Sequence, residues 1–271
     1  MNKTNPGVAL VTGASSGIGY AAAKALQKAG YRVFGTSRRA AAERSDGITT
    51  LTCDVTNDKS VAKVVDRVLA DAGHIDLLVN NAGIGLFGAA EESSTAQAQA
   101  LFDVNVFGVL RMTNAVLPAM RRQGNGRIVN VSSVLGLIPA PYAALYASTK
   151  HAIEGYSESL DHELRSLGIR VVLVEPAYTR TSFGENLIKA DQLLDVYDSA
   201  RAGMNVILQK AMTTADAPEI VARTILEAAT AAAPRRRYAA GKMARQVSLL
   251  RRFVPASAFD KSLRKQNGLP V

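Results

Sequence analysis

The sequence predicts an α/β fold in which helices cover both faces of a parallel sheet. Short apolar runs of strand length alternate along the chain with longer segments of helical periodicity. Two of these runs, Leu77–Val79 and Arg170–Val174, lack the polar alternation of a half-exposed strand. Such runs are typical of parallel strands that are buried on both faces.

The expected elements follow one another as a layered sheet requires. We expect strands at Val8–Val11, Tyr31–Thr36, Thr49–Cys53, Leu77–Asn80, Arg127–Ser132, Arg170–Glu175 and Arg237–Ala240. Helices are expected between them at Gly17–Lys28, Lys59–Ala70, Ala98–Arg122, Ala143–Ser166 and Pro218–Ala231. Gly30 and Gly73 lie just beyond two of these helices, where glycine favours a helix end. We find no linker or internal repeat, so residues 1–271 are expected to form one domain.

Length and composition argue against a disulfide-stabilised, a membrane-spanning or a secreted protein. A chain of 271 residues with 48% hydrophobic residues can bury a large core without a disulfide or a metal, and we expect neither. Cys53 is the single cysteine and is expected to be an ordinary strand residue, in keeping with a reducing cytoplasm. The longest apolar runs are shorter than a membrane span. A glycine motif begins at Thr12, which leaves no room before it for a secretory signal, so a cytoplasmic protein is expected.

Two segments fall outside the alternation. Residues 181–214 have an irregular pattern beyond a strand end, where such segments usually form a lid over a ligand crevice. Residues 242–271 form a basic extension. Residues 235–271 contain ten basic residues and one acid, which accounts for the whole net charge of +9. A neutral body with a basic tail is unlike a nucleic-acid-binding face, so we expect either a solvated tail or a weak contact with anionic lipid or another subunit.

A glycine-rich loop joins the first strand to the first helix. Its sequence is Thr12-Gly13-Ala14-Ser15-Ser16-Gly17-Ile18-Gly19. Gly13 permits a tight turn, Gly17 lets the backbone approach a pyrophosphate, and Gly19 lets the helix pack closely on the sheet. The helix start then offers free N–H groups and a positive dipole end to an anion. The loop therefore predicts a dinucleotide site.

The end of the second strand indicates which dinucleotide binds. An acid about 20 residues after the glycines would hold the ribose 2′-hydroxyl of NAD(H). The chain has Ser37, Arg38 and Arg39 there instead. Guanidinium groups suit a phosphate by charge and by shape, so we expect NADP(H) in preference to NAD(H). The alternative is that the two arginines are solvated loop charges.

A reaction centre is expected on the helix at Ala143–Ser166. Tyr146 and Lys150 are four residues apart and share a helix face, so the ammonium could lower the phenol pKa toward neutrality. Ser132 and Ser133 end a strand, where a hydroxyl would face the crevice and polarise a carbonyl. We favour Ser133 because adjacent strand residues point to opposite faces, and a bulge would reverse that choice.

Two asparagine positions have more than one interpretation. Asn80-Asn81-Ala82-Gly83 ends the fourth strand and is either a turn that braces the sheet or a ligand contact. Asn105 lies in an apolar helical stretch, where a buried amide needs partners and could take part in a water relay.

These residues together resemble the short-chain dehydrogenase/reductase family, from Val8 to about Gly241. The shared features are Thr12-Gly13-x3-Gly17-x-Gly19, Asp54-Val55, Asn80-Asn81-Ala82-Gly83, Asn105, Ser133, Tyr146-x3-Lys150 and Pro176-x4-Thr181. The resemblance implies a single-domain Rossmann-type, doubly wound sheet of seven parallel strands. It also implies a homodimer or homotetramer.

The resemblance further implies residue roles. Tyr146 corresponds to the catalytic acid/base, Ser133 to the hydroxyl that orients the carbonyl, and Asn105 to the holder of a relay water. Lys150 would lower the tyrosine pKa and bind the nicotinamide ribose. The remaining cofactor contacts would come from Asp54 and Val55 at the adenine, from Asn81, Ala82 and Gly83 along the cofactor, and from Pro176 and Thr181 at the nicotinamide. Ala177 stands where the family usually has glycine, which makes the place of Thr181 less secure.

The last part of the chain is weakly similar to the hydroxysteroid and retinol dehydrogenase branch. An apolar set near the expected crevice would suit a lipophilic substrate: Leu135, Leu137, Ile138, Tyr142, Tyr178, Phe183 and Leu187. The expected function is hydride transfer between NADP(H) and a lipophilic ketone/secondary alcohol or aldehyde/alcohol pair. The alternative is a sensor or regulator that binds NADP(H) without catalysis.

Overall fold

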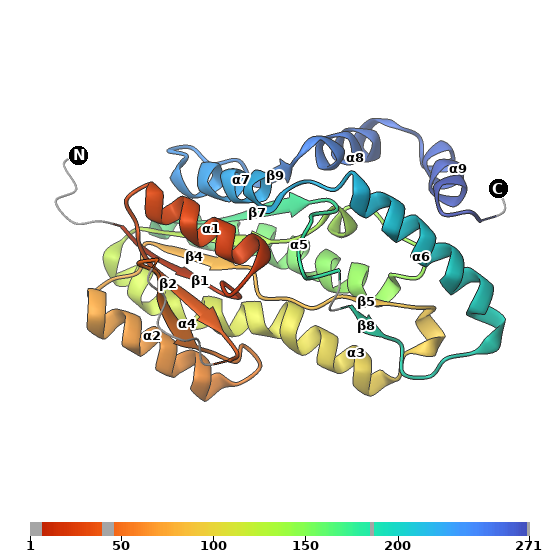
Figure 1. Cartoon of the computed structure of the whole chain (residues 1–271). Helices are drawn as coiled ribbons and strands as arrows, with labels where there is room; N and C mark the ends of the chain where they lie inside the picture. The colour runs from red at the N-terminus through yellow and green to blue at the C-terminus, as the bar shows by residue number, and fades with distance from the viewer. Residues whose placement is uncertain (1–6, 40–45, 185–186, 270–271) are drawn as a thin grey trace.

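Seven parallel strands form the central sheet of the computed structural model, which describes residues 7–39, 46–184 and 187–269. Their order across the sheet is β3-β2-β1-β4-β6-β7-β9 (Figure 1). The strands are β1 (Val8–Val11), β2 (Arg32–Ser37), β3 (Thr49–Thr52), β4 (Leu77–Asn80), β6 (Gly126–Val131), β7 (Ile169–Pro176) and β9 (Arg237–Ala240). The predicted α/β sheet is therefore confirmed, with strand ends shifted by one residue in places.

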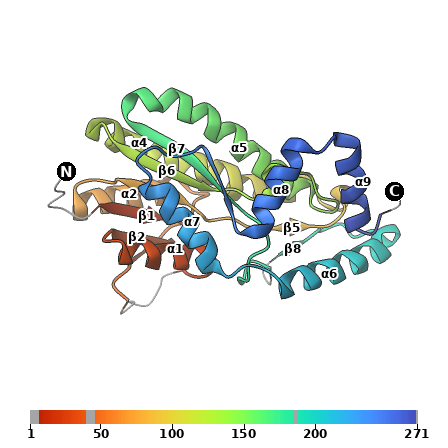
Figure 2. The same cartoon turned by 90° about the horizontal axis from the view of Figure 1, so that it is seen from above.

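Helices cover both faces of this sheet (Figures 1 and 2). One face carries α1 (Gly17–Lys28) and α7 (Pro218–Thr230), and the other carries α2 (Asp58–Ala72), α4 (Gly108–Gln123) and α5 (Ala144–Leu164). The side chains of β1 alternate between the two layers. Val8 and Leu10 pack with α2, α4 and α5, whereas Ala9 and Val11 pack with α1 and α7.

The strand order places a ligand crevice beside β1. The chain runs outward from β1 through β2 to β3, and then crosses back to β4 on the other side of β1. Helices leave β1 and β4 on opposite faces at this point, which opens a crevice at the carboxyl ends of the two strands. Val11 pairs with Val79, so the loops that follow these residues begin side by side.

One long helix combines three segments: α3 (Thr95–Phe102), a π-helical turn η2 (Asp103–Phe107) and α4. We expected no segment able to span a membrane, yet Thr95–Gln123 is long and apolar enough by length and composition. Half of its most apolar window is buried within the protein. Met112, Val116 and Met120 are fully buried against the sheet, so this is a core helix and not a clear membrane span.

The segment 181–214 is more regular than its pattern indicated. Its described part contains a short strand β8 (Ile188–Lys189), which pairs with β5 (Leu86–Phe87), and a helix α6 (Asp198–Thr213). The sequence pattern is irregular because α6 buries no residue and so needs no periodic apolar face; that the segment forms a lid stays a prediction.

Glu92 anchors this lid to the domain. It lies in a 3-10 turn, η1 (Ala90–Glu92), and its carboxylate is fully buried. It accepts a hydrogen bond of 2.9 Å from the Leu194 N–H and pairs with Arg201 of α6.

The basic extension is helical. It forms α8 (Lys242–Phe253) and α9 (Ala256–Gln266), which lie at the same end of the molecule as α6 (Figure 2). Residues 270–271 of the expected extension lie outside the described part of the chain.

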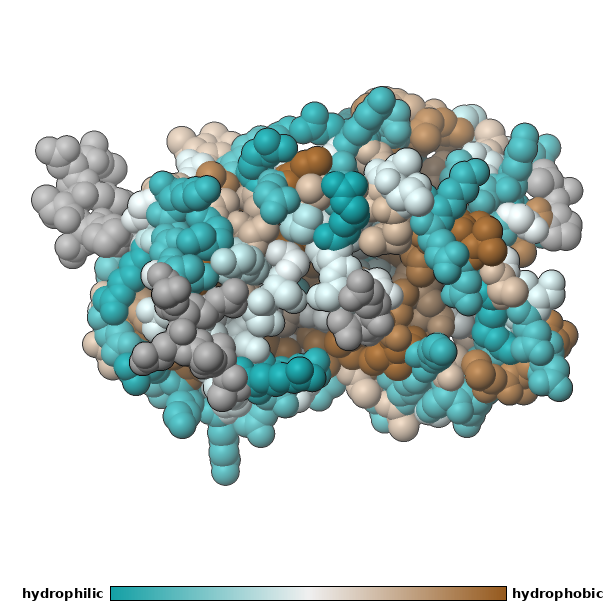
Figure 3. Space-filling view, viewed as in Figure 1, coloured by the Kyte–Doolittle hydropathy of each residue, from teal (hydrophilic) through white to brown (hydrophobic). Residues whose placement is uncertain are grey.

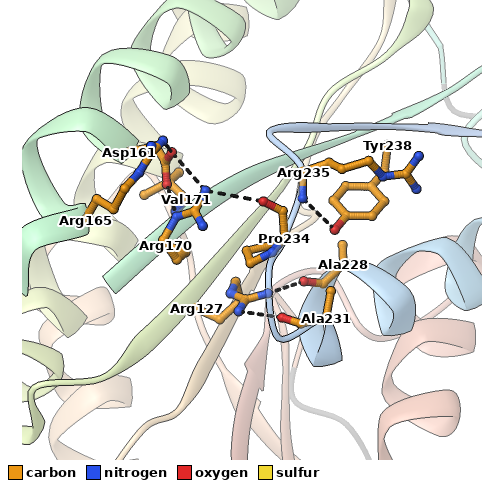
Figure 4. Close-up of polar contacts among 10 residues, drawn as sticks. All are labelled: Arg127, Asp161, Arg165, Arg170, Val171, Ala228, Ala231, Pro234, Arg235 and Tyr238. Carbon is orange, nitrogen blue, oxygen red and sulfur yellow. Dashed lines mark hydrogen bonds and ion pairs between the residues drawn. The ribbon is translucent and has the colours of Figure 1, made fainter. Parts of the chain in front are cut away.

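A buried carboxylate ties α5 to the amino end of β7 (Figure 4). Asp161 is fully buried and accepts hydrogen bonds from Arg170 Nε (2.8 Å) and from the Val171 N–H (3.0 Å), while Arg165 pairs with its other oxygen. Burial works to raise the pKa of Asp161, but these donors outweigh it and hold the pKa at about 2.

A further arginine, Arg127, joins a strand to a helix at the same end of the sheet. Arg127 of β6 donates to the carbonyl oxygens of Ala228 (2.5 Å) and Ala231 (3.1 Å) at the end of α7. A cation at a helix C-terminus satisfies unpaired carbonyls and complements the helix dipole. Arg170 also reaches the Pro234 carbonyl at 3.4 Å, so α5, β6, β7 and α7 are joined (Figure 4).

We predict that Asp161→Asn lowers the free energy of unfolding at neutral pH by about 2 kcal/mol, because the pKa of Asp161 lies about two units below its unfolded value. In the wild type this contribution is present above the unfolded pKa of 3.8 and is lost as pH falls through about 2. Urea unfolding at several pH values measures both effects. The control is Asp66→Asn, which changes an exposed carboxylate of α2. An Asp161→Asn variant as stable as the wild type would contradict the prediction.

Candidate active site

The four residues expected at the reaction centre are all buried near the carboxyl ends of the strands. Tyr146 and Lys150 lie in α5, Ser133 follows β6, and Asn105 lies in the π turn η2. The structure thus brings together side chains that are far apart in the sequence.

Tyr146 and Ser133 are in direct contact. Their hydroxyl groups form a hydrogen bond, and the Ser133 oxygen also accepts one from the Leu135 N–H at 3.1 Å. That second bond caps the short turn η3 (Val134–Gly136) and fixes the serine beside the phenol. Ser132 is placed differently: its buried hydroxyl has no hydrogen-bond partner in the described part of the chain.

Lys150 lies beside the tyrosine ring and not at its hydroxyl. Its ammonium donates to the Val131 carbonyl at 3.0 Å and is 5.6 Å from the centroid of the Tyr146 ring. Burial lowers the pKa of Lys150 to about 8, although Glu154 one turn further along α5 opposes this.

The expected fall in the pKa of Tyr146 does not occur in this structure. Burial raises the pKa of Tyr146 well above its ordinary value, and only the hydrogen bond with Ser133 opposes the rise. The i, i+4 spacing correctly places Lys150 on the same face, but spacing contains no information about how deeply the phenol is buried. The tyrosine therefore holds its proton firmly at neutral pH.

The Asn105 side chain is fully engaged by the protein. Its oxygen accepts from the Ile84 N–H at 2.9 Å, and its nitrogen donates to the Ile84 carbonyl (2.9 Å) and to Thr149 Oγ1 (3.2 Å). The Thr149 hydroxyl in turn donates to the Tyr146 carbonyl at 2.7 Å. A relay through Asn105 would therefore have to use its main chain, which lies in a π turn, a feature often found at functional sites.

Asn81 braces the glycine loop. Its side-chain nitrogen donates to the carbonyls of Thr12 (2.9 Å) and Gly13 (3.2 Å). The Thr12 hydroxyl accepts from the N–H groups of Asn81 (2.9 Å) and Ala82 (3.0 Å). Asn80 is also structural, because it donates to Asn130 at 2.9 Å. We interpreted this turn as either a brace for the sheet or a ligand contact, and the side chains of Asn80 and Asn81 both act as braces.

The glycine loop has the shape of a phosphate cradle. Gly13 and Gly17 have φ of +64° and +55°, which side chains disfavour. A Cβ on Gly19 would lie 2.3 Å from the Gly13 carbonyl oxygen and 2.4 Å from Asn81 Nδ2. The other expected loop contacts, Ser15, Ser16 and Ile18, lie in the same loop and the first turn of α1. These residues fit a dinucleotide with its phosphates at the start of α1.

The expected adenosine contacts gather after β2 and β3. Arg38 is exposed at the end of β2, and the Arg39 N–H donates to the Ser37 hydroxyl at 3.3 Å. Hydrogen bonds from Thr56, and then the charge of Arg38, lower the pKa of Asp54. Arg38 is thus near enough to Asp54 for its charge to act on the carboxylate. Next to Asp54, Val55 is buried and would touch a Cβ on Gly108.

Thr181 lies over the glycine loop despite the unusual Ala177. A Cβ on Gly17 would lie 3.1 Å from the Thr181 side chain. The Thr181 hydroxyl accepts from the Phe183 N–H at 3.2 Å, which fixes the start of the lid. Pro176 ends β7 just before this turn.

Aromatic rings surround the tyrosine. The ring centroids of Phe87 and Phe183 are 6.1 and 6.0 Å from that of Tyr146. Tyr142 has φ of +61°, a rare value for a side chain of this size, and its ring meets that of Tyr197 edge-on. Sequence reasoning selected Phe183 and Tyr142 but missed Phe87, since β5 is too short to give a pattern.

A second buried polar cluster adjoins the centre. Glu154 of α5 and Glu175 of β7 are buried and pair with Arg237 of β9 at 2.8 and 3.2 Å. Burial, followed by the charge of Glu154, raises the pKa of Glu175 to about 8, while Arg237 opposes this. Sequence reasoning missed this cluster, although an acid at the end of an otherwise apolar strand was a usable signal.

Comparison with known proteins gives one matching family model and several similar proteins. A family model described as short chain dehydrogenase matches residues 7–192. The 3-ketodihydrosphingosine reductase of Bacteroides thetaiotaomicron is 41% identical over 181 residues, which cover 67% of each chain. The uncharacterized oxidoreductase YusZ of Bacillus subtilis is 36% identical over 279 residues, which cover 97% of this chain and 99% of its own.

Solved structures agree with these relatives. A short-chain dehydrogenase from Streptomyces avermitilis superposes with a TM-score of 0.81 at 34% identity, covering 98% of this chain and 96% of its own. A 3-ketoacyl-(acyl-carrier-protein) reductase from Brucella melitensis complexed with NADH has a TM-score of 0.72 at 28% identity, covering 83% and 91%. ElxO with NADP bound has a TM-score of 0.70 at 27% identity, covering 84% and 92%.

We predict that Gly19→Ala abolishes nucleotide binding or weakens it at least about a hundredfold, because the added methyl group would collide with the loop backbone. Gly155→Ala in α5 is the matched control, since a Cβ there meets nothing within 4 Å and alanine favours a helix. Fluorescence titration with NADPH and NADH measures affinity, and thermal unfolding shows that each variant folds. Unchanged affinity in a folded Gly19→Ala variant would contradict the cradle.

Proposed function

Because the chain belongs to the short-chain dehydrogenase/reductase family of oxidoreductases, we propose that it transfers hydride between NADP(H) and a lipophilic ketone/secondary alcohol or aldehyde/alcohol pair. One observation carries the proposal. The hydrogen-bonded pair of Tyr146 and Ser133 is buried among aromatic rings at the sheet edge where the glycine loop begins. That arrangement supplies a proton donor, an orienting hydroxyl and an apolar wall together.

The residues that would hold the cofactor are those of the cradle and of the adenosine end. The Gly13–Gly19 loop and the start of α1 would hold the phosphates, Asp54 and Val55 the adenine, and Thr181 with Lys150 the nicotinamide side. When bound, the cofactor supplies the hydride, and the protein supplies placement and protonation.

The chain's own residues account for the proton. In the reducing direction Tyr146 gives its proton to the carbonyl oxygen, and Ser133 holds that oxygen by a hydrogen bond. A phenol whose pKa is raised by burial stays protonated at neutral pH, which suits an acid. The oxidising direction needs a lower phenol pKa, and a cationic Lys150 beside the ring is the chain's own group that would lower it.

The preference for NADP(H) over NAD(H) depends on the residues at the end of β2. Among the structural neighbours one is complexed with NADH and another has NADP bound, so either dinucleotide fits the fold. Arg38 is exposed there and the position expected for a ribose-binding acid is Ser37. A guanidinium beside the ribose favours a 2′-phosphate, which supports NADP(H).

The substrate class depends on the walls of the centre. Phe87, Phe183 and Leu187 surround the approach to Tyr146, since a Cβ on Gly85 would touch both Leu187 and Phe183. Apolar walls with a few placed polar groups suit a lipophilic carbonyl compound. The name of the Bacteroides relative, a reductase of 3-ketodihydrosphingosine, is consistent with such a substrate.

A non-catalytic NADP(H) sensor is the alternative. A sensor does not need a buried phenol bonded to a serine next to a lysine with a lowered pKa, and this chain has all three groups. The homo-oligomeric state and the cytoplasmic location expected from the sequence stay predictions.

We predict that Tyr146→Phe lowers the turnover number by about 10²–10⁴-fold, because it removes the proton and keeps the ring. The dissociation constant for NADPH should change by no more than about twofold. Steady-state oxidation of NADPH with a panel of ketones and aldehydes gives the rate, and fluorescence titration gives the affinity. Near-normal turnover would remove the proposed role and favour the sensor.

The two adjacent serines provide an internal control for this test. Ser133→Ala should also lower turnover by about 10²-fold or more, because Ser133 contacts the phenol. Ser132→Ala should leave turnover within about threefold, because its hydroxyl forms no hydrogen bond in the described part of the chain. The reverse pattern would exchange the two assignments.

We predict that Arg38→Asp raises the Michaelis constant for NADPH by about 10-fold to 100-fold and leaves that for NADH nearly unchanged, because the acid repels the 2′-phosphate. Arg121→Asp, at an exposed position at the end of α4, is the control for a general change of charge. An equal change for both dinucleotides would contradict the preference for NADP(H).

A further inference from the structure

The last two helices border the active site. α8 packs against η3, the turn that begins at Ser133, and α9 continues from it across the same end of the molecule (Figures 1 and 2). In α8 only Ala244 is buried, and α9 buries no residue. We therefore asked what surface these helices present.

α8 carries an apolar stripe that faces away from the protein. The stripe consists of Met243, Leu249, Leu250 and Phe253, whose exposed fractions are 40%, 58%, 49% and 71%. At roughly 100° per residue these four side chains fall within one third of the helix circumference. Ala244, the residue of α8 that is fully buried, lies on the opposite side. Figure 3 shows the hydrophobic surface over α8.

The described residues do not cover this stripe. α8 is separated from α7 by an open groove of about 680 Å³, and Leu249 lies on its edge together with Ile220 and Arg223. An apolar helix face left in this position marks an interaction surface in most soluble proteins.

Basic side chains accompany the stripe. Between residues 242 and 266 the chain has seven lysines and arginines and one acid, Asp260. Arg245 and Arg252 lie on one side of the stripe, whereas Arg251 falls near Ala244 on the opposite face, with its guanidinium 5.7 Å from the ring centroid of Phe259 in α9; all three are exposed. An exposed apolar stripe bounded by arginines is typical of a helix that lies in a membrane interface.

Charge favours lipid over the other occupants. A second copy of this chain would bring another strongly basic surface against the first, and like charges repel. A nucleic acid would neutralise the arginines but offers no apolar layer for Leu250 and Phe253. Anionic lipid offers both phosphates and acyl chains.

We propose that α8 and α9 dock the protein on an anionic lipid surface. Leu249, Leu250 and Phe253 enter the boundary between headgroups and acyl chains, and Arg245 and Arg252 contact lipid phosphates. Docking in this way sets the η3 side of the active site next to the bilayer. The proposal is independent of the proposed reaction, because binding can be measured without substrate or cofactor.

Co-sedimentation of the full chain with lipid vesicles tests the proposal. We expect binding to vesicles of phosphatidylcholine mixed with phosphatidylglycerol, much weaker binding to phosphatidylcholine alone, and a loss of binding between about 0.1 and 0.5 M salt. Arg245→Glu with Arg252→Glu should lower the partition coefficient at least about tenfold. Leu250→Ser with Phe253→Ser should lower it by a similar factor, because the acyl layer then gains no apolar contact.

Matched control variants lie elsewhere on the surface. Arg121→Glu with Arg122→Glu reverses an adjacent exposed pair at the end of α4, and Leu167→Ser removes an exposed leucine before β7. Both should bind within about twofold of the wild type, and thermal unfolding shows that every variant folds.

Three results would overturn the proposal. The first is no binding of the wild type to anionic vesicles, and the second is equal binding to both kinds of vesicle. The third is an oligomer, measured by light scattering, that Leu250→Ser with Phe253→Ser dissociates, since a second copy would then cover the stripe.

Discussion

The hydrogen bonds between Thr12 and the turn at Asn81 are the constraint on which the site depends. A parallel sheet leaves backbone groups unpaired where its strands end, and the glycines that follow β1 have no side chains with which to satisfy them. Asn81 and the Thr12 hydroxyl supply four of these bonds and join β1 to β4. Because Gly19 packs directly on this junction, the start of α1 takes its position from it.

The two ends of the sheet use polar groups in different ways. At the amino end, Asp161 accepts hydrogen bonds from Arg170 and Val171, and Arg127 donates to two carbonyl oxygens at the end of α7, so that helices and strands are joined there. At the carboxyl end, Tyr146, Lys150 and Glu175 are buried with pKa values moved away from their ordinary ones. Such groups are costly to bury, and they gather where a reaction would use them.

The sequence predicts the part of this structure that depends on short-range pattern. Buried strands such as Val171–Val174, the glycine loop and the shared face of Tyr146 and Lys150 follow from spacing alone. Properties that depend on the assembled fold could not be read in this way. The burial of the Tyr146 phenol, the ring of Phe87 beside it and the helical form of the lid all depend on contacts between distant segments. The roles of the individual site residues stay predictions.

The lid anchor has a consequence for how such a protein diversifies. Glu92 fixes the lid through one buried carboxylate, and the family model ends at residue 192, just before α6 begins. Because α6 buries no residue, its side chains can change without disturbing the core, whereas α7 and β9 further along the chain contribute buried residues. Descendants of one ancestral chain could thus acquire new substrates by altering a single appendage.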